Sequence, residues 1–300
     1  MHADPKRHLW LLGLAIPVVA STALLGFAHG PKRLRSVFAS TSLITLHGII
    51  PWLDRYFAED PYQLERKQLN TLQHDPYYQR VVAAYLPLQY GCNLYSAYLA
   101  TQTKTRITDV VLLGSLLALV NVVGMNVAHE LGHKSKQYQH LLAHIALLPS
   151  AYSHFRIEHN YAHHRFVVTP QDPASAYWGE SFWRFLPRTV FGGLKSAIHI
   201  EQQRLARKQL GFWHPHNELL QAWAAGLVYH GCMLKCFGRK WLVLQLAQVA
   251  YTITLLEAVN YMEHYGLKRQ RLSTGMYEPV SAQHSWNHNS LLSNLLFYHL

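Results

Sequence analysis

Residues 107–133 read ITDVVLLGSLLALVNVVGMNVAHELGH, a long apolar run that ends in a pair of histidines. No charged residue occurs between Val110 and Ala128. A helix needs about 20 predominantly apolar residues to cross the hydrocarbon core of a bilayer. This stretch therefore predicts a transmembrane helix that carries a metal-binding motif at its end.

Five more apolar runs predict further spans, and the first of them is too long for a signal peptide. The runs cover residues 9–28, 37–53, 81–100, 219–237 and 241–262. A shorter run over residues 141–152 suits an interfacial or half-buried helix better than a span. We expect an all-α, integral membrane bundle of six helices, which forms a single domain over residues 1–300.

The basic residues predict the orientation of this bundle. With the N-terminus in the cytoplasm, 19 of the 27 Lys and Arg lie on the cytoplasmic side, as the positive-inside rule requires. We therefore expect a multi-pass protein of the cytoplasmic (inner) membrane. All histidine-rich segments then lie on its cytoplasmic side.

Composition also favours a membrane protein. Half of the residues are apolar and only 14% are charged, while 21 histidines lower the mean hydropathy to −0.04. The net charge of +11 suits anionic lipid or an acidic protein partner. Nucleic acid is not expected, because the basic residues are spread over loops between apolar runs. The three cysteines lie in apolar stretches and are expected to be free thiols.

The first histidine motif is HELGH, residues 129–133. His129 and His133 are four residues apart, so both imidazoles lie on one helical face and can bind one metal. Taken alone, this is the H-E-x-x-H pattern of zinc metalloproteases, in which Glu130 would be the general base.

A second motif changes that interpretation. Residues 158–165 read EHNYAHHR and place His159, His163 and His164 at positions i, i+4 and i+5 of a helix. A catalytic zinc site uses about three protein ligands. Five imidazoles exceed that number, and the surplus indicates two metal ions.

A third element, NYMEHYGL at residues 260–267, closes the last apolar run and contains His264. Glu257 lies seven residues earlier, on nearly the same helical face. An ionisable group at this depth indicates a functional site, although a carboxylate at a helix end can also reach water. Both interpretations of Glu257 stand.

Neutral nitrogen ligands suit iron better than magnesium or calcium, while copper and zinc also bind imidazole. Several carboxylates near the motifs are expected to orient the imidazoles by accepting their second ring N–H. They are Glu130, Glu158, Glu263 and Asp172, with Glu257 as a further candidate.

These motifs resemble those of the membrane alkane 1-monooxygenases, distant relatives of the integral-membrane fatty acid desaturases. The resemblance rests on HELGHK (129–134), EHNYAHHR (158–165) and NYMEHYGL (260–267), in this order around six apolar runs. The third string separates alkane hydroxylases from desaturases. The similarity covers nearly the whole chain, including TPQDPA (169–174) and QHSWN (283–287).

The resemblance implies a non-haem di-iron enzyme that uses dioxygen to hydroxylate the terminal carbon of alkanes to primary alcohols. It implies two iron ions, electrons from rubredoxin and its reductase, an alkane taken from the lipid phase, and no catalytic residue beyond the metal centre. The implied iron ligands are His129, His133, His159, His163, His164 and His264.

One departure from the family concerns the C-terminus. The family carries a final H-x-x-H-H motif soon after the stretch that corresponds to residues 293–300, where this chain stops. Six of nine expected imidazole ligands are therefore present. We expect a truncated chain that binds one iron but does not turn over. His284 and His299 lie close to the missing motif and are candidates for supporting it.

Three alternatives remain. They are a desaturase or another hydroxylase of the same superfamily, an intramembrane zinc protease, and a non-catalytic metal- or haem-binding membrane protein. The surplus of imidazoles and the family strings favour the monooxygenase.

Other histidines are expected at the surface or in supporting positions. They are His140, His144, His154, His199, His214, His216 and His230. His47, in the middle of the second span, should face the bundle interior, where it either lines the substrate route or pairs with a polar neighbour.

A basic segment follows the second motif. Its members are Arg184, Arg188, Lys195, Arg204, Arg207 and Lys208. These cations would steer an acidic rubredoxin or contact anionic lipid headgroups, and the sequence supports both interpretations equally.

Overall fold

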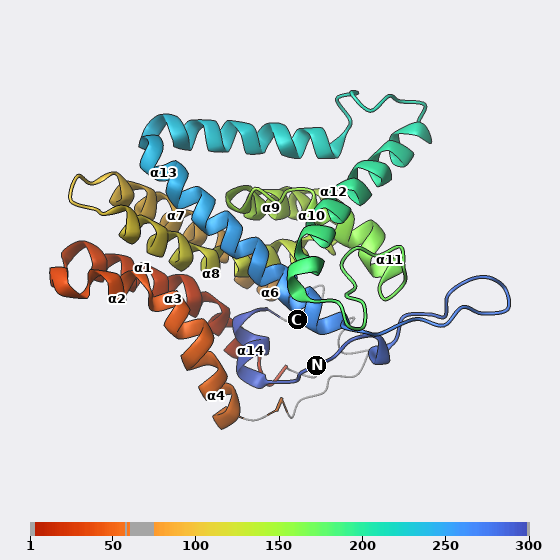
Figure 1. Ribbon diagram of the computed structural model, residues 1–300, viewed down its shortest axis with the longest axis horizontal. Helices are drawn as coiled ribbons and strands as arrows, with labels where there is room; N and C mark the ends of the chain where they lie inside the picture. Colours follow the sequence, from red (N-terminus) through yellow and green to blue (C-terminus); the bar gives the residue numbers. More distant parts are fainter. Residues whose placement is uncertain (1–3, 58, 61–74, 299–300) are drawn as a thin grey trace. The chain divides into compact units, whose positions relative to one another are not determined.

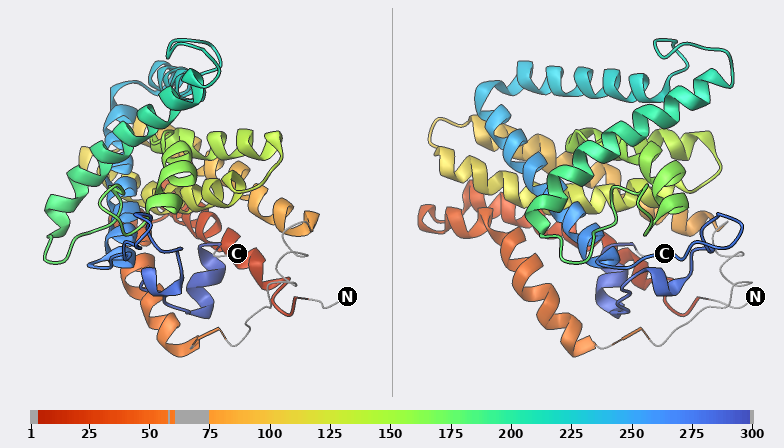
Figure 2. Two further views of the ribbon diagram at one scale, coloured as in Figure 1. Left: turned by 90° about the vertical axis from the view of Figure 1, so that its right-hand side faces the viewer. Right: turned by 45° about the vertical axis from the view of Figure 1, so that its right-hand side comes forward.

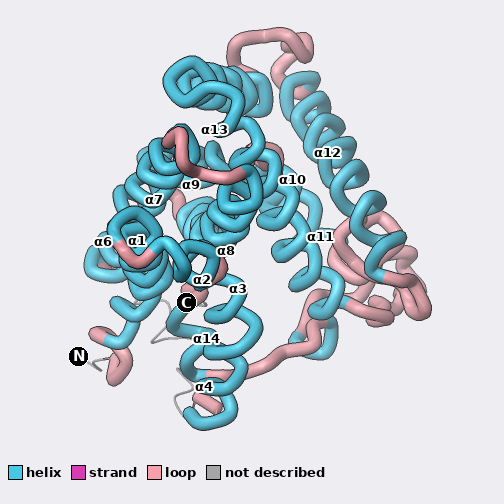
Figure 3. Tube along the Cα trace, turned by 60° about the vertical axis from the view of Figure 1, so that its left-hand side comes forward, coloured by secondary structure: helices cyan, strands magenta, loops and turns pink. Residues whose placement is uncertain are grey.

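The computed structural model describes residues 4–57, 59–60 and 75–298 (Figure 1). Within these residues the regular structure is helical (Figure 3), and the β-pairing is limited to isolated bridges at Glu59–Ser290 and Arg271–Tyr277. The all-α prediction is confirmed. The chain divides into two compact units. His299, one of the predicted supporting residues, lies outside the described residues.

The first unit comprises Met1–Ala151, Tyr229–Thr252 and Asn289–Leu300. Its helices are η1 (Leu9–Leu14), α1 (Ala15–His29), η2 (Lys32–Leu34), α2 (Arg35–Ala39), α3 (Thr41–Ile44), the π-helical η3 (Thr45–Ile49), α4 (Ile50–Phe57), α6 (Pro76–Ala83), α7 (Tyr85–Thr101), α8 (Ile107–Gly132), α9 (Gln137–Leu147), η4 (Leu148–Ser150) and α14 (Leu291–Leu296), together with the middle of α13 (Glu218–His264).

Helix α8 is the centre of the first unit, where it packs against α1, α2, α3, α7 and α9. Most of its apolar side chains are buried, among them Leu113, Leu117 and Val123, while Ile107 and Val111 are exposed. Gly114 permits a close approach of α13, because a Cβ atom there would lie 2.7 Å from the Ala247 side chain. The run that predicted a span is thus also the core of this unit.

A network of buried amides joins α7, α8 and α13 within the first unit. Asn121 accepts from Gln89 at 3.0 Å and donates to Gln248 at 2.8 Å, while Asn93 also donates to Asn121 at 3.0 Å. Polar groups inside a bilayer must find partners within the protein. The network meets that requirement and fixes the register of the three helices.

Three helical segments of the described residues are long and apolar enough to cross a membrane, namely Leu9–His29, α8 and α13. A fourth is possible if Lys32–Ala39 and Thr41–Phe57, bent by 49°, form one span. Helix α13 is broken at Gly238, where φ is 68° (Figure 2), and the break lies between the last two predicted spans. The count of six spans stays a prediction.

The second unit comprises Tyr152–Val228 and Ile253–His288. Its helices are α10 (Phe155–Glu158), the π-helical η5 (His159–His163), α11 (His164–Phe166), α12 (Phe182–Ala206), the two ends of α13, and η6 (Ala282–His284). Helix α12 packs on α10 and η5, around a small core that contains Ile157, Ala197 and Leu219. The second histidine motif is therefore held by α12.

Candidate metal centre

The first unit contributes His129 and His133 from the last turns of α8. Their Nε2 atoms are 3.0 Å apart and their rings are 4.5 Å apart between centroids. Nitrogen ligands lie about 2.0–2.1 Å from a bound zinc ion, so two ring nitrogens at this separation could reach one ion. The two imidazoles therefore already face one another as ligands of a single ion would.

The second motif forms a π-helical turn, His159–His163, rather than the regular α-helix expected from its spacing. Hydrogen bonds from i to i+5 widen the turn, and such turns are frequent at functional sites. The ring centroid of His159 lies 5.0 Å from that of His163 and 4.5 Å from that of His164. The three predicted ligands of this motif thus lie together.

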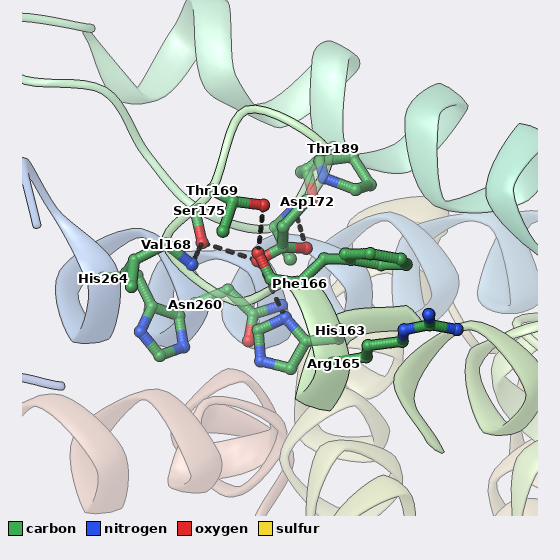
Figure 4. A network of polar contacts seen from close by, with 12 residues as sticks. His163, Arg165, Phe166, Val168, Thr169, Asp172, Ser175, Thr189, Asn260 and His264 are labelled. Carbon is green, nitrogen blue, oxygen red and sulfur yellow. Dashed lines mark hydrogen bonds and ion pairs between the residues drawn. The ribbon is translucent and has the colours of Figure 1, made fainter. Parts of the chain in front are cut away.

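His163 is oriented by Asp172 (Figure 4). Its Nδ1 lies 3.1 Å from Asp172 Oδ2, and the same carboxylate accepts from Ser175 Oγ at 2.5 Å and from the Ala174 backbone N–H at 3.0 Å. An imidazole that donates from Nδ1 to a carboxylate presents Nε2 as its free donor atom. Asp172 therefore occupies the orienting position that its chemistry predicted.

The pKa values of this pair follow from burial and charge. Burial alone would lower the pKa of His163, but the charge and hydrogen bond of Asp172 outweigh it, and together with Glu158 they raise the pKa to about 9. Burial would raise the pKa of Asp172, yet His163 and the donors around the carboxylate hold it below its usual value. In the metal-free protein the pair is therefore an ion pair at neutral pH.

His264 ends α13 and lies beside His163, with 5.1 Å between ring centroids. Its Nδ1 lies 3.1 Å from the backbone oxygen of His284. Its buried Nε2 has no hydrogen-bond partner among the described residues, since the Glu263 carboxylate is 3.8 Å away. A buried ring nitrogen in this state fits a metal ligand.

His284 supports His264 through its backbone. The His284 side chain is buried and turns away to accept from the Ser281 backbone N–H at 3.0 Å, and its Nε2 lies 3.3 Å from Glu278. The support expected of His284 for the missing C-terminal motif stays a prediction, and its contact with His264 was not foreseen, because it is made by a carbonyl group.

The remaining carboxylates differ in their surroundings. Glu130 forms a salt bridge with Lys134, and Glu263 accepts from Ser285 at 2.9 Å. Glu158 is buried beside His159, and burial raises its pKa to about 8. The carboxylate–imidazole contact that Figure 4 shows is the one between Asp172 and His163.

Glu257 is buried, with 3% of its surface exposed, so the interpretation as a helix-end carboxylate in water is wrong. It accepts from Tyr152 at 3.0 Å, Thr189 at 2.9 Å and Asn260 at 3.1 Å. These groups line a small cavity that also borders Glu158. Tyr152 and Thr189 were missed by sequence reasoning, because nothing in their local pattern marks them.

Several histidines outside the motifs have polar partners. His47 is exposed, so the expectation that it faces the bundle interior is wrong, whereas its Nε2 lies 2.7 Å from the Tyr251 hydroxyl, a polar neighbour. His140 lies 2.6 Å from the Lys134 carbonyl and His199 lies 2.8 Å from Gln203.

Within each unit, the histidines of the motifs are suitable ligands for a metal ion. The pair His129 and His133, and the pair His159 and His164, each offer ligand atoms within 4.8 Å of one another. All are neutral nitrogen donors, which suit iron and other transition metals. Carboxylate support is present at His163.

Comparison with known proteins yields one family. The family model of the fatty acid desaturases matches residues 109–300. The alkane 1-monooxygenase of Acinetobacter baylyi is 44% identical over 99% of this chain and 73% of its own length. Alkane 1-monooxygenase 1 of Alcanivorax borkumensis is 34% identical over 100% of this chain and 73% of its own. The xylene/toluene monooxygenase hydroxylase component of Pseudomonas putida is 26% identical over 91% and 70%.

Proposed function

Because the chain belongs to the alkane 1-monooxygenase family, within the fatty acid desaturase family, we propose that it is a non-haem di-iron monooxygenase. It hydroxylates the terminal carbon of alkanes to primary alcohols. Dioxygen is the oxidant, and rubredoxin, reduced by its reductase, supplies the electrons. The observation that carries this proposal is the buried His163–Asp172 pair beside the unpartnered Nε2 of His264, at positions of the family motifs.

The six histidines of the motifs would hold the iron. Bound iron supplies the oxidising chemistry, since reduced iron with dioxygen can insert oxygen into a C–H bond. Asp172 fixes the tautomer of His163, so Nε2 is the atom offered to the metal. The His284 carbonyl does the same for His264. Both contacts limit ring rotation, which keeps the ligand set ready before metal binding.

The substrate enters from the lipid phase in this proposal. An alkane offers no polar group, so its selection depends on the shape of an apolar route. We propose six spans, with the two parts of α13 on either side of Gly238 as the last two, in the cytoplasmic membrane. With the N-terminus in the cytoplasm, the histidines lie at the cytoplasmic side. Terminal selectivity follows if only the chain end reaches the metal centre.

The alternative chemistries are less well supported. The relatives above are named as monooxygenases, which favours oxygen chemistry over proteolysis. Glu130, the general base required by a zinc protease, is engaged in a salt bridge with Lys134. A hydroxylase with a different substrate is the nearest competitor, since one relative is named for xylene and toluene.

The decisive test is product analysis. Membranes that contain the full-length protein receive dioxygen, reduced rubredoxin and a medium-chain alkane, and products are identified by gas chromatography–mass spectrometry. We expect a primary alcohol whose formation depends on rubredoxin and is lost in His163→Ala. His216→Ala, a matched change at an exposed histidine, should retain activity. An iron-loaded, inserted protein that yields no alcohol would redirect the assignment to fatty acyl or aromatic substrates.

A further inference from the structure

The second unit contains a large hollow of about 960 Å³ that is bordered by α12 and by residues 161–177. Pockets of this size hold small molecules or their larger parts. Five cationic side chains line it, and they are Arg165, Arg188, Lys195, Arg204 and Arg207. Only two carboxylates, those of Asp172 and Glu201, line it as well.

The cations are not all neutralised. Arg188 pairs with Glu180 at 2.7 Å, and Arg204 donates to Glu201 at 2.7 Å through Nε. Asp172 is occupied by His163.

The three other cations, Arg165, Lys195 and Arg207, have no carboxylate within salt-bridge distance among the described residues, and all three are exposed. One hollow therefore presents three uncompensated positive charges. Its complement is an anion that carries more than one acceptor oxygen.

Two exposed aromatic side chains lie on α12 near these cations. Trp183 and Phe191 are 75% and 63% exposed, and they precede Lys195 by 12 and 4 residues, so the three side chains lie within about 120° of one another around α12. Residues four apart lie on one helix face. A face that combines exposed aromatic rings with Lys and Arg is typical of a helix at a membrane surface.

We propose that this hollow binds the phosphate group of an anionic phospholipid, with Trp183 and Phe191 at the acyl boundary. Guanidinium groups match phosphate oxygens in geometry as well as in charge. The concave shape and the neighbouring aromatic line favour a lipid headgroup over the acidic surface of an electron carrier. The basic segment thus has a specific proposed ligand, at a hollow that shares Asp172 with the metal centre.

The test measures binding, so it does not depend on turnover. The purified chain in neutral detergent is titrated with short-chain phosphatidylglycerol, with the matching diacylglycerol that lacks phosphate, and with glycerol 3-phosphate. We expect phosphatidylglycerol to bind and the other two to bind at least tenfold more weakly. Equal affinity for glycerol 3-phosphate would assign the hollow to a soluble phosphate compound and overturn the lipid proposal.

Variants distinguish the hollow from general surface charge. Lys195→Gln and Arg207→Gln should each lower the affinity for phosphatidylglycerol about tenfold, since a hydrogen bond to a charged group contributes roughly that factor. Lys208→Gln removes an equal charge from a residue outside the hollow and should change the affinity for phosphatidylglycerol less than twofold. Equal losses in all three variants would overturn the proposal. So would unchanged lipid binding with a raised KM for rubredoxin, which would assign the hollow to protein docking.

Discussion

Replacing Asp172 by Asn removes the charge beside His163 while keeping the size of the side chain. In the metal-free protein the pKa of His163 is about 9, so a metal ion must displace a proton from this ring. At pH 7 about one His163 in a hundred is neutral, and the apparent metal affinity should be about hundredfold lower than at pH well above 9. Between these values the affinity should rise close to tenfold per pH unit.

The Asn variant should largely lose this pH dependence. Without the carboxylate, burial is the largest remaining influence and lowers the pKa of His163, against the weaker raising effect of Glu158 and Glu263, so we expect a mostly neutral ring at pH 7–9. The ligand also loses the orienting carboxylate, which typically weakens metal affinity 10–100-fold. We expect the metal affinity of Asp172→Asn to be 10–100-fold below that of the native protein at pH 9. The two affinities should converge near pH 7, because only in the native protein does a proton compete with the metal there.

Titration of the purified metal-free chain with Co²⁺, followed by visible absorption at several pH values, measures the metal affinity and its dependence on pH. Ser175→Ala is the control, since it removes a hydrogen bond to Asp172 but keeps the charge. Glu158, whose pKa is about 8, titrates in the same range in the native protein and in the Ser175→Ala control, whereas Asp172→Asn removes one of the charges that raise it. A pH slope in Asp172→Asn equal to the native slope would refute this account of His163.

Three further predictions concern packing and ligand support. Gly114→Val should lower the thermal unfolding temperature in detergent, because the new side chain would collide with Ala247, and overpacking typically destabilises by about 1–3 kcal/mol. Asn121→Leu should destabilise the protein by about 1–2 kcal/mol in the same assay, since it leaves buried amides unpaired. His264→Ala should weaken Co²⁺ binding at least tenfold, whereas His284→Ala should change it less than threefold, because His284 contacts His264 through its carbonyl.

The predictable part of the site is the part encoded within one helix. The i, i+4 spacing of His129 and His133 sufficed to predict two facing imidazoles, because α8 is regular to its end. The same spacing rule described the second motif only approximately. The π-helical turn His159–His163 depends on how α12 and α10 pack around it, and no local pattern expresses that packing.

Contacts between distant segments were predictable in kind but not in detail. Asp172 was expected to orient an imidazole, and the structure identifies His163 as its partner. Glu257 was recognised as unusual, yet its partners Tyr152 and Thr189 come from segments more than 60 residues away. Hydroxyl groups are common in loops and helices alike, so only the fold reveals which of them meet a buried carboxylate.

Gly266 shows how the third motif is tied to the second one. Its φ of 71° is left-handed, and a Cβ atom would lie 2.7 Å from the Trp178 ring. Both constraints require glycine. The turn that this glycine permits lets its own N–H donate to the Ala176 carbonyl at 3.0 Å, and the Arg269 N–H donates to the Val168 carbonyl at 3.0 Å. Those two bonds bracket Asp172, so the segment that carries the orienting carboxylate is fixed to the segment that carries His264. The glycine of NYMEHYGL therefore acts on the ligand geometry through the backbone, without contacting a metal.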